Sequence, residues 1–597
     1  MKIINGYKSY SLREIYGRIL KYAWRSKWIL LLSIVLTFAV LYLSNLLPMI
    51  TGALIDDYIK NLVGHSVAER IQGLNQTIIL YGIIFLIVVI MRYILNYIFT
   101  WAAMILERDI RLDALKKLND LPVSYYDSEP DGKIVTRINN DVGGLRSLYQ
   151  VFLSVVQSLI NIVMVYGFLF VLDRNLALYS LGIFPFVILW ITFFRKKIFK
   201  FNTAIRELSS KINAKINELV TGVPVIQVFS QEEEMMADYN DLVRKMNDQQ
   251  NKLNVTSTLF GWELLLVIRR IATAGIIAYF GFRYFSYPEL ITVGLVFTFL
   301  QLIDRLVEPI NAIFNNLNAL EDSKVAANRI FAYMDEENDS NLYGGKECLS
   351  LNGDINFNNI TFAYIPGINV LKNVNLNVKE GQSVGIVGHT GSGKSSLMNL
   401  LCRFYDYQEG EIMIGKDKID EFQKRSFRQH VGIILQTPIL FSGTIKSNVT
   451  MEDDSVPDER IIEVLKAIGA DYIIKKYPEG LNAPINFKGD NLSVGEKQLI
   501  SFARILIKDP KILILDEATA NIDTETEIKI KEAMHVITAK RTTFIIAHRL
   551  STIKACDKII VLDKGSLIGE GSHASLYQTC APYRDMYDAQ YENQLEE

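Results

Sequence analysis

The chain has 597 residues, of which 50% are hydrophobic and only 21% are charged. Its mean hydropathy is +0.17, whereas soluble enzymes rarely average above zero, so we expect parts of the chain to lie in lipid. The 63 basic and 65 acidic residues nearly cancel, which gives no bulk attraction to nucleic acid, and 4 scattered cysteines argue against a disulfide scaffold or a zinc site.

The N-terminal half contains the predicted membrane spans. A helix needs about 20 apolar residues to cross a bilayer. Four segments of about that length or more carry no charged residue: 28–55, 71–91, 147–172 and 175–194. Charged residues interrupt two further predicted spans, 257–285 and 290–312. Ahead of the first span, residues 10–26 are expected to form an amphipathic helix on the inner membrane surface.

Charge in the loops predicts the orientation of the spans. Residues 107–146 contain seven Lys and Arg side chains and residues 195–252 contain ten, far more than the intervening loops. The positive-inside rule therefore places these loops, the N-terminus and the chain after the sixth span in the cytoplasm. Both loops have helix-forming composition, so the spans are expected to continue beyond the bilayer as helices. Residues 122–132 and 221–224 are predicted to break these helices and to form short crossing helices.

From about residue 353, short β-rich runs alternate with helical ones, which predicts an α/β domain with a largely parallel sheet. Between a predicted strand and a predicted helix lies Gly388-x4-Gly393-Lys394-Ser395, the pattern of a phosphate-binding P-loop. Its glycines let backbone N–H groups surround a phosphate, Lys394 adds a cation, and Ser395 can bind Mg²⁺. The predicted ATP-contacting residues of this loop are Gly388, His389, Thr390, Gly391, Ser392, Gly393, Lys394, Ser395 and Ser396.

A second motif is an apolar strand, from residue 511, that ends in Asp516 and Glu517. Asp516 is placed to hold Mg²⁺, and Glu517 is placed to orient or deprotonate the attacking water. Two acids after a strand are, taken alone, more often a helix N-cap. Their combination with an upstream P-loop favours the catalytic interpretation.

Between these motifs lies Leu492-Ser493-Val494-Gly495-Glu496, which resembles the signature of the ATP-binding cassette (ABC) superfamily, usually LSGGQ. Other residues match the family's elements in order. The resemblance makes Tyr364 the aromatic that stacks on adenine, Gln436 the Q-loop glutamine that links Mg²⁺ to the membrane domain, Asp523 the D-loop aspartate, and His548 the switch histidine at the γ-phosphate. Taken singly, Tyr364 is better explained as a packed surface aromatic and His548 as a structural residue; the ordered set indicates the family.

The resemblance covers the whole chain and implies an exporter half-transporter. It implies a six-span α-helical membrane domain with long cytoplasmic helix extensions, the type I ABC exporter fold, followed by an α/β P-loop ATPase. The expected boundaries are 1–325 for the membrane domain, with coupling helices near 122–140 and 215–230, then a linker at 326–352 and the nucleotide-binding domain at 353–597. Expected cofactors are ATP and Mg²⁺, the latter held by Ser395, Gln436 and Asp516. The expected location is the bacterial cytoplasmic membrane, with the ATPase domain inside.

The resemblance also implies a dimer, because each ATP lies between the P-loop of one subunit and the signature of the other. Here the signature has Val494 in place of Gly and Glu496 in place of Gln. A β-branched side chain and a carboxylate near the γ-phosphate are both expected to weaken that site. With Glu517 and His548 present, this pattern resembles the competent subunit of heterodimeric bacterial multidrug exporters. A homodimer with a tolerated signature variant is the alternative.

The cargo is expected to be hydrophobic or amphipathic. Arg92, Glu263 and Asp304 lie within predicted spans and are candidates to line a cavity for cationic or amphipathic cargo, with Glu263 and Asp304 as the best contact candidates. Interhelical ion pairs explain the same charges more simply. A lipid flippase fits the same sequence. A channel or regulator that ATP merely gates is disfavoured, because a gate needs no efficient catalytic base such as Glu517.

Overall fold

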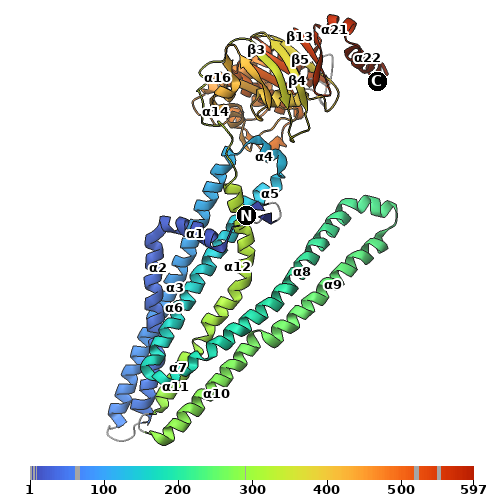
Figure 1. Ribbon diagram of the computed structural model, residues 1–597. Helices are drawn as coiled ribbons and strands as arrows, with labels where there is room; N and C mark the ends of the chain where they lie inside the picture. The colour runs from blue at the N-terminus through green and yellow to red at the C-terminus, as the bar shows by residue number, and fades with distance from the viewer. Residues whose placement is uncertain are drawn as a thin grey trace. The chain divides into compact units, whose positions relative to one another are not determined.

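The computed structural model describes residues 3–4, 7–8, 10–60, 67–288, 291–516, 524–546 and 553–596 (Figure 1). These residues form two compact units. The first comprises Met1–Lys116 and Gly132–Glu336, and the second comprises Lys117–Asp131 and Glu337–Glu597. Each unit is described by itself.

The first unit is helical. Its main helices are α1 (Leu12–Ala23), α2 (Lys27–Leu54), α3 (Val67–Asp120), α5 (Asp131–Thr136), α6 (Val142–Leu172), α7 (Arg174–Leu181), α8 (Ile183–Val228), α9 (Glu232–Phe260), α10 (Trp262–Ser286), α11 (Val293–Asp304) and α12 (Val307–Met334). By length and composition, four helical stretches of the described chain can cross a membrane: Leu12–Ile59, Val67–Asp120, Asp131–Leu172 and Arg174–Val228. They contain the four uncharged segments predicted from the sequence. The fifth and sixth predicted spans correspond to α10 and to α11 with α12.

Helix α1 is amphipathic, as predicted for residues 10–26. Ser11 and Glu14 form a capping box at its start, and Ile15 and Ile19 are fully buried on one face. The Arg18 guanidinium donates two hydrogen bonds of 2.9 and 2.6 Å to the carboxylate of Asp335, just after α12. These contacts join the N-terminal helix to the end of the sixth span.

Helices α8 and α9 form an antiparallel hairpin that extends away from the other helices of the first unit (Figure 1). The predicted break at 221–224 is wrong, because α8 continues through Pro224 to Val228 and the chain reverses at Phe229–Gln231. Pro224 removes only one donor of the ladder, and it lies close to the helix end, where the remaining bonds suffice. No described side chain of α9 is buried.

The predicted break at 122–132 is confirmed. Helix α3 ends at Asp120, a short helix α4 (Val123–Ser128) follows, and α5 begins at Asp131. The segment Lys117–Asp131 belongs to the second unit, where it contacts the nucleotide-binding portion of the chain. The Asp339 N–H donates a 2.7 Å bond to the carbonyl of Asp120, and the Tyr405 hydroxyl bonds the Asp127 carboxylate.

The second unit contains two principal sheets. The larger has the order β14-β13-β5-β12-β11-β8, formed by β14 (Ser566–Gly571), β13 (Lys558–Asp563), β5 (Ser383–Val387), β12 (Thr542–Ile546), β11 (Ile512–Asp516) and β8 (Val431–Ile434). All its pairs are parallel except β13 with β14. This confirms the predicted parallel sheet, whose inner strands β5, β12 and β11 are almost entirely buried because both faces are covered.

The smaller sheet was not predicted. It is antiparallel with the order β4-β3-β6-β7, formed by β4 (Leu371–Val378), β3 (Ile355–Phe362), β6 (Glu409–Ile414) and β7 (Asp417–Lys418). Burial alternates with exposure along β4, as expected for a sheet with one solvated face. The alternating sequence of β4 is the signal that distinguishes it from the parallel strands.

A buried ion pair anchors Lys117–Asp131 to this unit. The Lys424 ammonium lies 2.8 Å from the Asp339 carboxylate, with side chains only 2% and 6% exposed. Arg428 lies 3.5 Å from the same carboxylate, and the Asp339 backbone bonds Asp120. Lys424 also lies 3.2 Å from the Asp406 carboxylate, so each charge of the pair has a second partner. Asp339 therefore fixes both the linker and the end of α3 to the ATPase portion.

Candidate ATP site and transmembrane site

The P-loop has the geometry of a phosphate cradle. It joins β5 to helix α13 (Lys394–Leu401), as the sequence predicts. Gly388 has φ +152°, and a Cβ there would lie 2.2 Å from the carbonyl oxygen of Leu562 and 2.5 Å from the Ser392 hydroxyl. Gly393 has φ +102° where it caps α13. Only glycine adopts these conformations in this space without strain. The two glycines therefore let the loop fold closely over the N-terminus of α13.

The polar groups of this loop fit a bound phosphate. Lys394 is buried, and its ammonium donates bonds of 2.6 and 3.1 Å to the carbonyls of Gly388 and His389. The buried hydroxyl of Ser392 has no hydrogen-bond partner among the described residues. Ser395 is exposed on the first turn of α13, where its hydroxyl is accessible to a metal ion. A cation, an unsatisfied hydroxyl and a helix N-terminus together suit a phosphate group.

The parallel sheet brings the other predicted residues to the same edge. Asp516 ends β11 and pairs with Ile546 of β12, which in turn pairs with Ile386 just before the P-loop. Gln436 follows β8, the neighbour of β11 on its other side. The carboxyl ends of parallel strands therefore gather the P-loop, Asp516 and Gln436, as expected for a nucleotide site. Glu517, Asp523 and His548 lie outside the described residues.

Tyr364 stands in an aromatic cluster beside this loop. Its ring is 43% exposed, and its hydroxyl donates a 3.1 Å bond to Ser396 of α13. The ring of Tyr405 packs edge-to-face against Tyr364 with centroids 4.8 Å apart. Burial and the bond to Asp127 raise the pKa of the Tyr405 phenol. Tyr405 therefore touches both the predicted adenine-stacking residue and α4, a connection that no sequence motif signals.

The signature begins helix α18 (Val494–Lys508), and its two unusual residues have different environments. The Glu496 carboxylate accepts a 2.8 Å bond from the Ser493 N–H, which completes a capping box, and it lies 3.0 Å from the Lys476 ammonium. The bond to Glu496 raises the pKa of Lys476. Glu496 is buried, whereas Val494 is 48% exposed. The charge expected to oppose the γ-phosphate is thus neutralised inside the same unit, and only Val494 alters the open surface.

Comparison with known proteins now decides the family. The model of the ABC transporter transmembrane region matches residues 30–310, and the ABC transporter model matches residues 371–520. The "Probable multidrug resistance ABC transporter ATP-binding/permease protein YheH" of Bacillus subtilis (strain 168) is 40% identical over 522 residues, which are 87% of this chain and 77% of that relative. The chain belongs to the ABC transporter family. It is an ATPase coupled to transmembrane transport.

The chain is similar to two further proteins. The "Fatty acid ABC transporter ATP-binding/permease protein" of Mycobacterium bovis (strain ATCC BAA-935 / AF2122/97) is 32% identical over 484 residues, covering 80% of this chain and 75% of that protein. A solved structure of a bacterial Atm1-family ABC exporter with ATP bound has a TM-score of 0.76 at 23% identity and covers 97% of this chain and 98% of that one. The type I exporter fold predicted for this transporter is confirmed.

The candidate cargo residues of the transporter lie in separate places. Arg92 and Glu263 are exposed on α3 and α10. Asp304, at the end of α11, lies 3.7 Å from the Arg269 guanidinium, so its charge already has a counterion. This agrees with the ion-pair alternative for Asp304.

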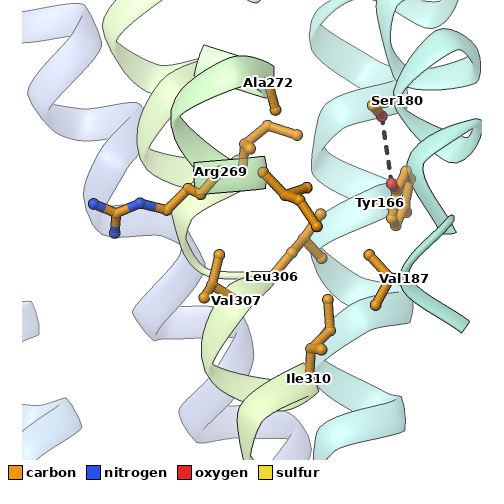
Figure 2. A pocket seen from close by; sticks show the side chains of 10 residues that line it. Tyr166, Ser180, Val187, Arg269, Ala272, Leu306, Val307 and Ile310 are labelled. Carbon is orange, nitrogen blue, oxygen red and sulfur yellow. Dashed lines mark hydrogen bonds between the residues drawn. The ribbon is translucent and has the colours of Figure 1, made fainter. Parts of the chain in front are cut away.

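A cavity of about 60 Å³ lies between the helices of the first unit (Figure 2). Its lining is mostly apolar and includes Val187, Leu306 and Ile310. The hydroxyls of Ser180 and Tyr166 meet at one side, and the Arg269 guanidinium points away from the space. The cavity offers an apolar surface with a single weak polar contact, which suits a hydrocarbon group rather than a charge.

The environment of Glu496 generates the first prediction. Glu496→Gln keeps a capping side chain and removes only the charge that Lys476 neutralises. We expect the ATP concentration for half-maximal ATPase activity to be unchanged in Glu496→Gln, whereas Lys476→Met, which leaves the Glu496 carboxylate without its counterion, should raise it. Val494→Gly, which alters the exposed position, serves as the comparison. It is expected to lower the ATP concentration for half-maximal activity. A clear gain in ATP affinity in Glu496→Gln alone would show that the carboxylate acts on the nucleotide.

Proposed function

We propose that this transporter uses ATP hydrolysis to export hydrophobic or amphipathic compounds of the multidrug type across the bacterial cytoplasmic membrane, with its N-terminus and ATPase unit in the cytoplasm. The observation that carries the proposal is a complete P-loop with Asp516 at the same edge of the sheet. The other unit of the same chain contains helices long and apolar enough to cross a membrane. The name of the Bacillus relative supports this cargo class. A lipid exporter is the second candidate, supported by the name of the mycobacterial relative.

The proposed chemistry distributes roles over the site. Lys394 and the P-loop N–H groups bind the β- and γ-phosphates, and Tyr364 stacks on the adenine. Ser395, Gln436 and Asp516 are proposed to hold Mg²⁺, which would neutralise charge on the phosphates. Glu517 orients or deprotonates the attacking water, and His548 contacts the γ-phosphate.

ABC exporters act as dimers, and the exposed α9 and the exposed Val494 agree with a surface completed by a second subunit. We propose that the partner is a different half-transporter. Val494 supports this choice, because its β-branched side chain stands where close approach to the γ-phosphate is required. Glu496 no longer supports it, since Lys476 neutralises the carboxylate.

Replacement of the catalytic base tests the export mechanism. In the complex reconstituted in proteoliposomes, Glu517→Gln should lower ATP turnover by about 10²–10⁴-fold and abolish ATP-dependent transport while nucleotide still binds. Glu479→Gln, which changes an exposed glutamate of the same unit, is the matched control and should behave as wild type. Steady ATP turnover unaffected by Glu517→Gln would refute the assignment of the base.

The native mass of the complex tests the heterodimer. We expect a complex purified from its own host through a tag on this chain to contain a second, different subunit of similar size. A complex of two copies of this 68.0 kDa chain would refute the heterodimer and leave the export proposal intact.

A further inference from the structure

The predicted sixth span, residues 290–312, is interrupted between two helices. Helix α11 ends at Asp304 and α12 begins at Val307, which leaves Arg305 and Leu306 in a turn. Pro309 explains the break, because it has no N–H to donate to the Arg305 carbonyl. The 12 residues of α11 span about 18 Å, less than the roughly 30 Å thickness of a hydrocarbon core, so Arg305 falls within the predicted span. Secondary transporters commonly place their binding sites at interrupted helices of this kind.

The Arg305 side chain is held by neutral groups of α2. Its Nη1 donates a 2.6 Å bond to the Ser44 hydroxyl and approaches the Asn45 side-chain oxygen at 3.5 Å. The Asn45 amide nitrogen in turn donates a 3.3 Å bond to the Asn161 side-chain oxygen on α6. Ser44 and Asn45 are only 7% and 1% exposed, so this polar group belongs to the interior of the helical unit. The guanidinium is thereby fixed in one direction.

Arg305 has no acidic counterion among the described residues. The adjacent Asp304 lies against Arg269 instead, and no carboxylate of the described chain lies within 4.0 Å of the Arg305 guanidinium. At longer range, the Arg305 charge is repelled by Arg92 and attracted by Glu308. The side chain is half-buried, and its Nε and Nη2 donors bond no described acceptor. A charge in the membrane without a counterion is expensive to maintain, and it is found where function requires it.

We propose that Arg305, oriented by Ser44 and Asn45, binds the anionic headgroup of an amphipathic cargo. The inference rests on the proposed export function and narrows its cargo to anionic amphiphiles. A guanidinium held through Nη1 can still present Nε and Nη2 as the parallel pair of donors that matches two oxygens of a carboxylate or phosphate. Lysine, as a point charge, cannot reproduce this geometry. The paired Asp304 argues against the cationic cargo considered from the sequence.

The test uses the tagged complex, purified from its host and reconstituted in proteoliposomes. The probes share one tail and differ in headgroup: pyrene-labelled dodecanoate, dodecyl phosphate and dodecylamine. We expect the carboxylate or the phosphate to stimulate the ATPase and to be transported, whereas the amine is not. Arg305→Gln should raise the half-maximal concentration of the anionic probe about tenfold, which corresponds to about 1.4 kcal/mol at 25 °C, with basal ATPase retained.

Arg270→Gln is the matched control, because Arg270 is exposed on α10 and forms no ion pair with any described residue. Arg270→Gln should have the same half-maximal concentration of the anionic probe as wild type. Arg305→Lys should lie between wild type and Arg305→Gln. Preference for the amine, or an unchanged anion response in Arg305→Gln, would overturn the inference and leave the export function standing. Absence of ATP-dependent transport for all probes, together with absent basal ATPase, would instead count against the proposed function.

Discussion

The constraint on which this structure depends is that one chain does not complete its own working surfaces. The signature helix presents Val494 outward, and the α8–α9 hairpin extends from the first unit with no described side chain of α9 buried. Apolar side chains along this hairpin, among them Val220, Val228 and Leu259, are more than half exposed. Apolar surface of this extent is stable only when lipid or another subunit covers it. The dimer of the ABC exporters supplies such a cover and also brings a second signature to each P-loop.

Inside the chain, two kinds of contact prepare the ATP unit for this role. The parallel sheet places the P-loop, Asp516 and Gln436 at one edge, so the phosphate-binding and metal-binding groups are positioned by backbone pairing. The second kind holds Lys117–Asp131 against the same unit through the Lys424–Asp339 pair and the bond between Tyr405 and Asp127. Because Tyr405 also packs on Tyr364, a change at the adenine has a direct physical path to α4.

Much of this could be predicted from the sequence, because the decisive signals are local. The uncharged segments, the P-loop between a strand and a helix, and the break at 122–132 each depend on neighbouring residues. The features that were predicted wrongly or not at all depend on residues that are distant in the sequence. Glu496 differs from the family pattern, but its charge is neutralised by Lys476 of another element. Pro224 indicated a break that the rest of α8 overrides, and the pairing of Asp127 with Tyr405 joins residues far apart in the chain. Arg305 could be seen as a charge in a span, but its neutral partners and missing counterion required the structure.

In the proposed mechanism, ATP binds between this chain's signature and the P-loop of its partner. Labelling of Val494→Cys with a maleimide tests it most directly, since all four native cysteines are buried. In the Glu517→Gln complex, Mg²⁺ and ATP should slow the labelling strongly, because closure covers position 494. Leu349→Cys, at a position 82% exposed, should label equally with and without ATP. Labelling at position 494 that ATP leaves unchanged would contradict the shared site.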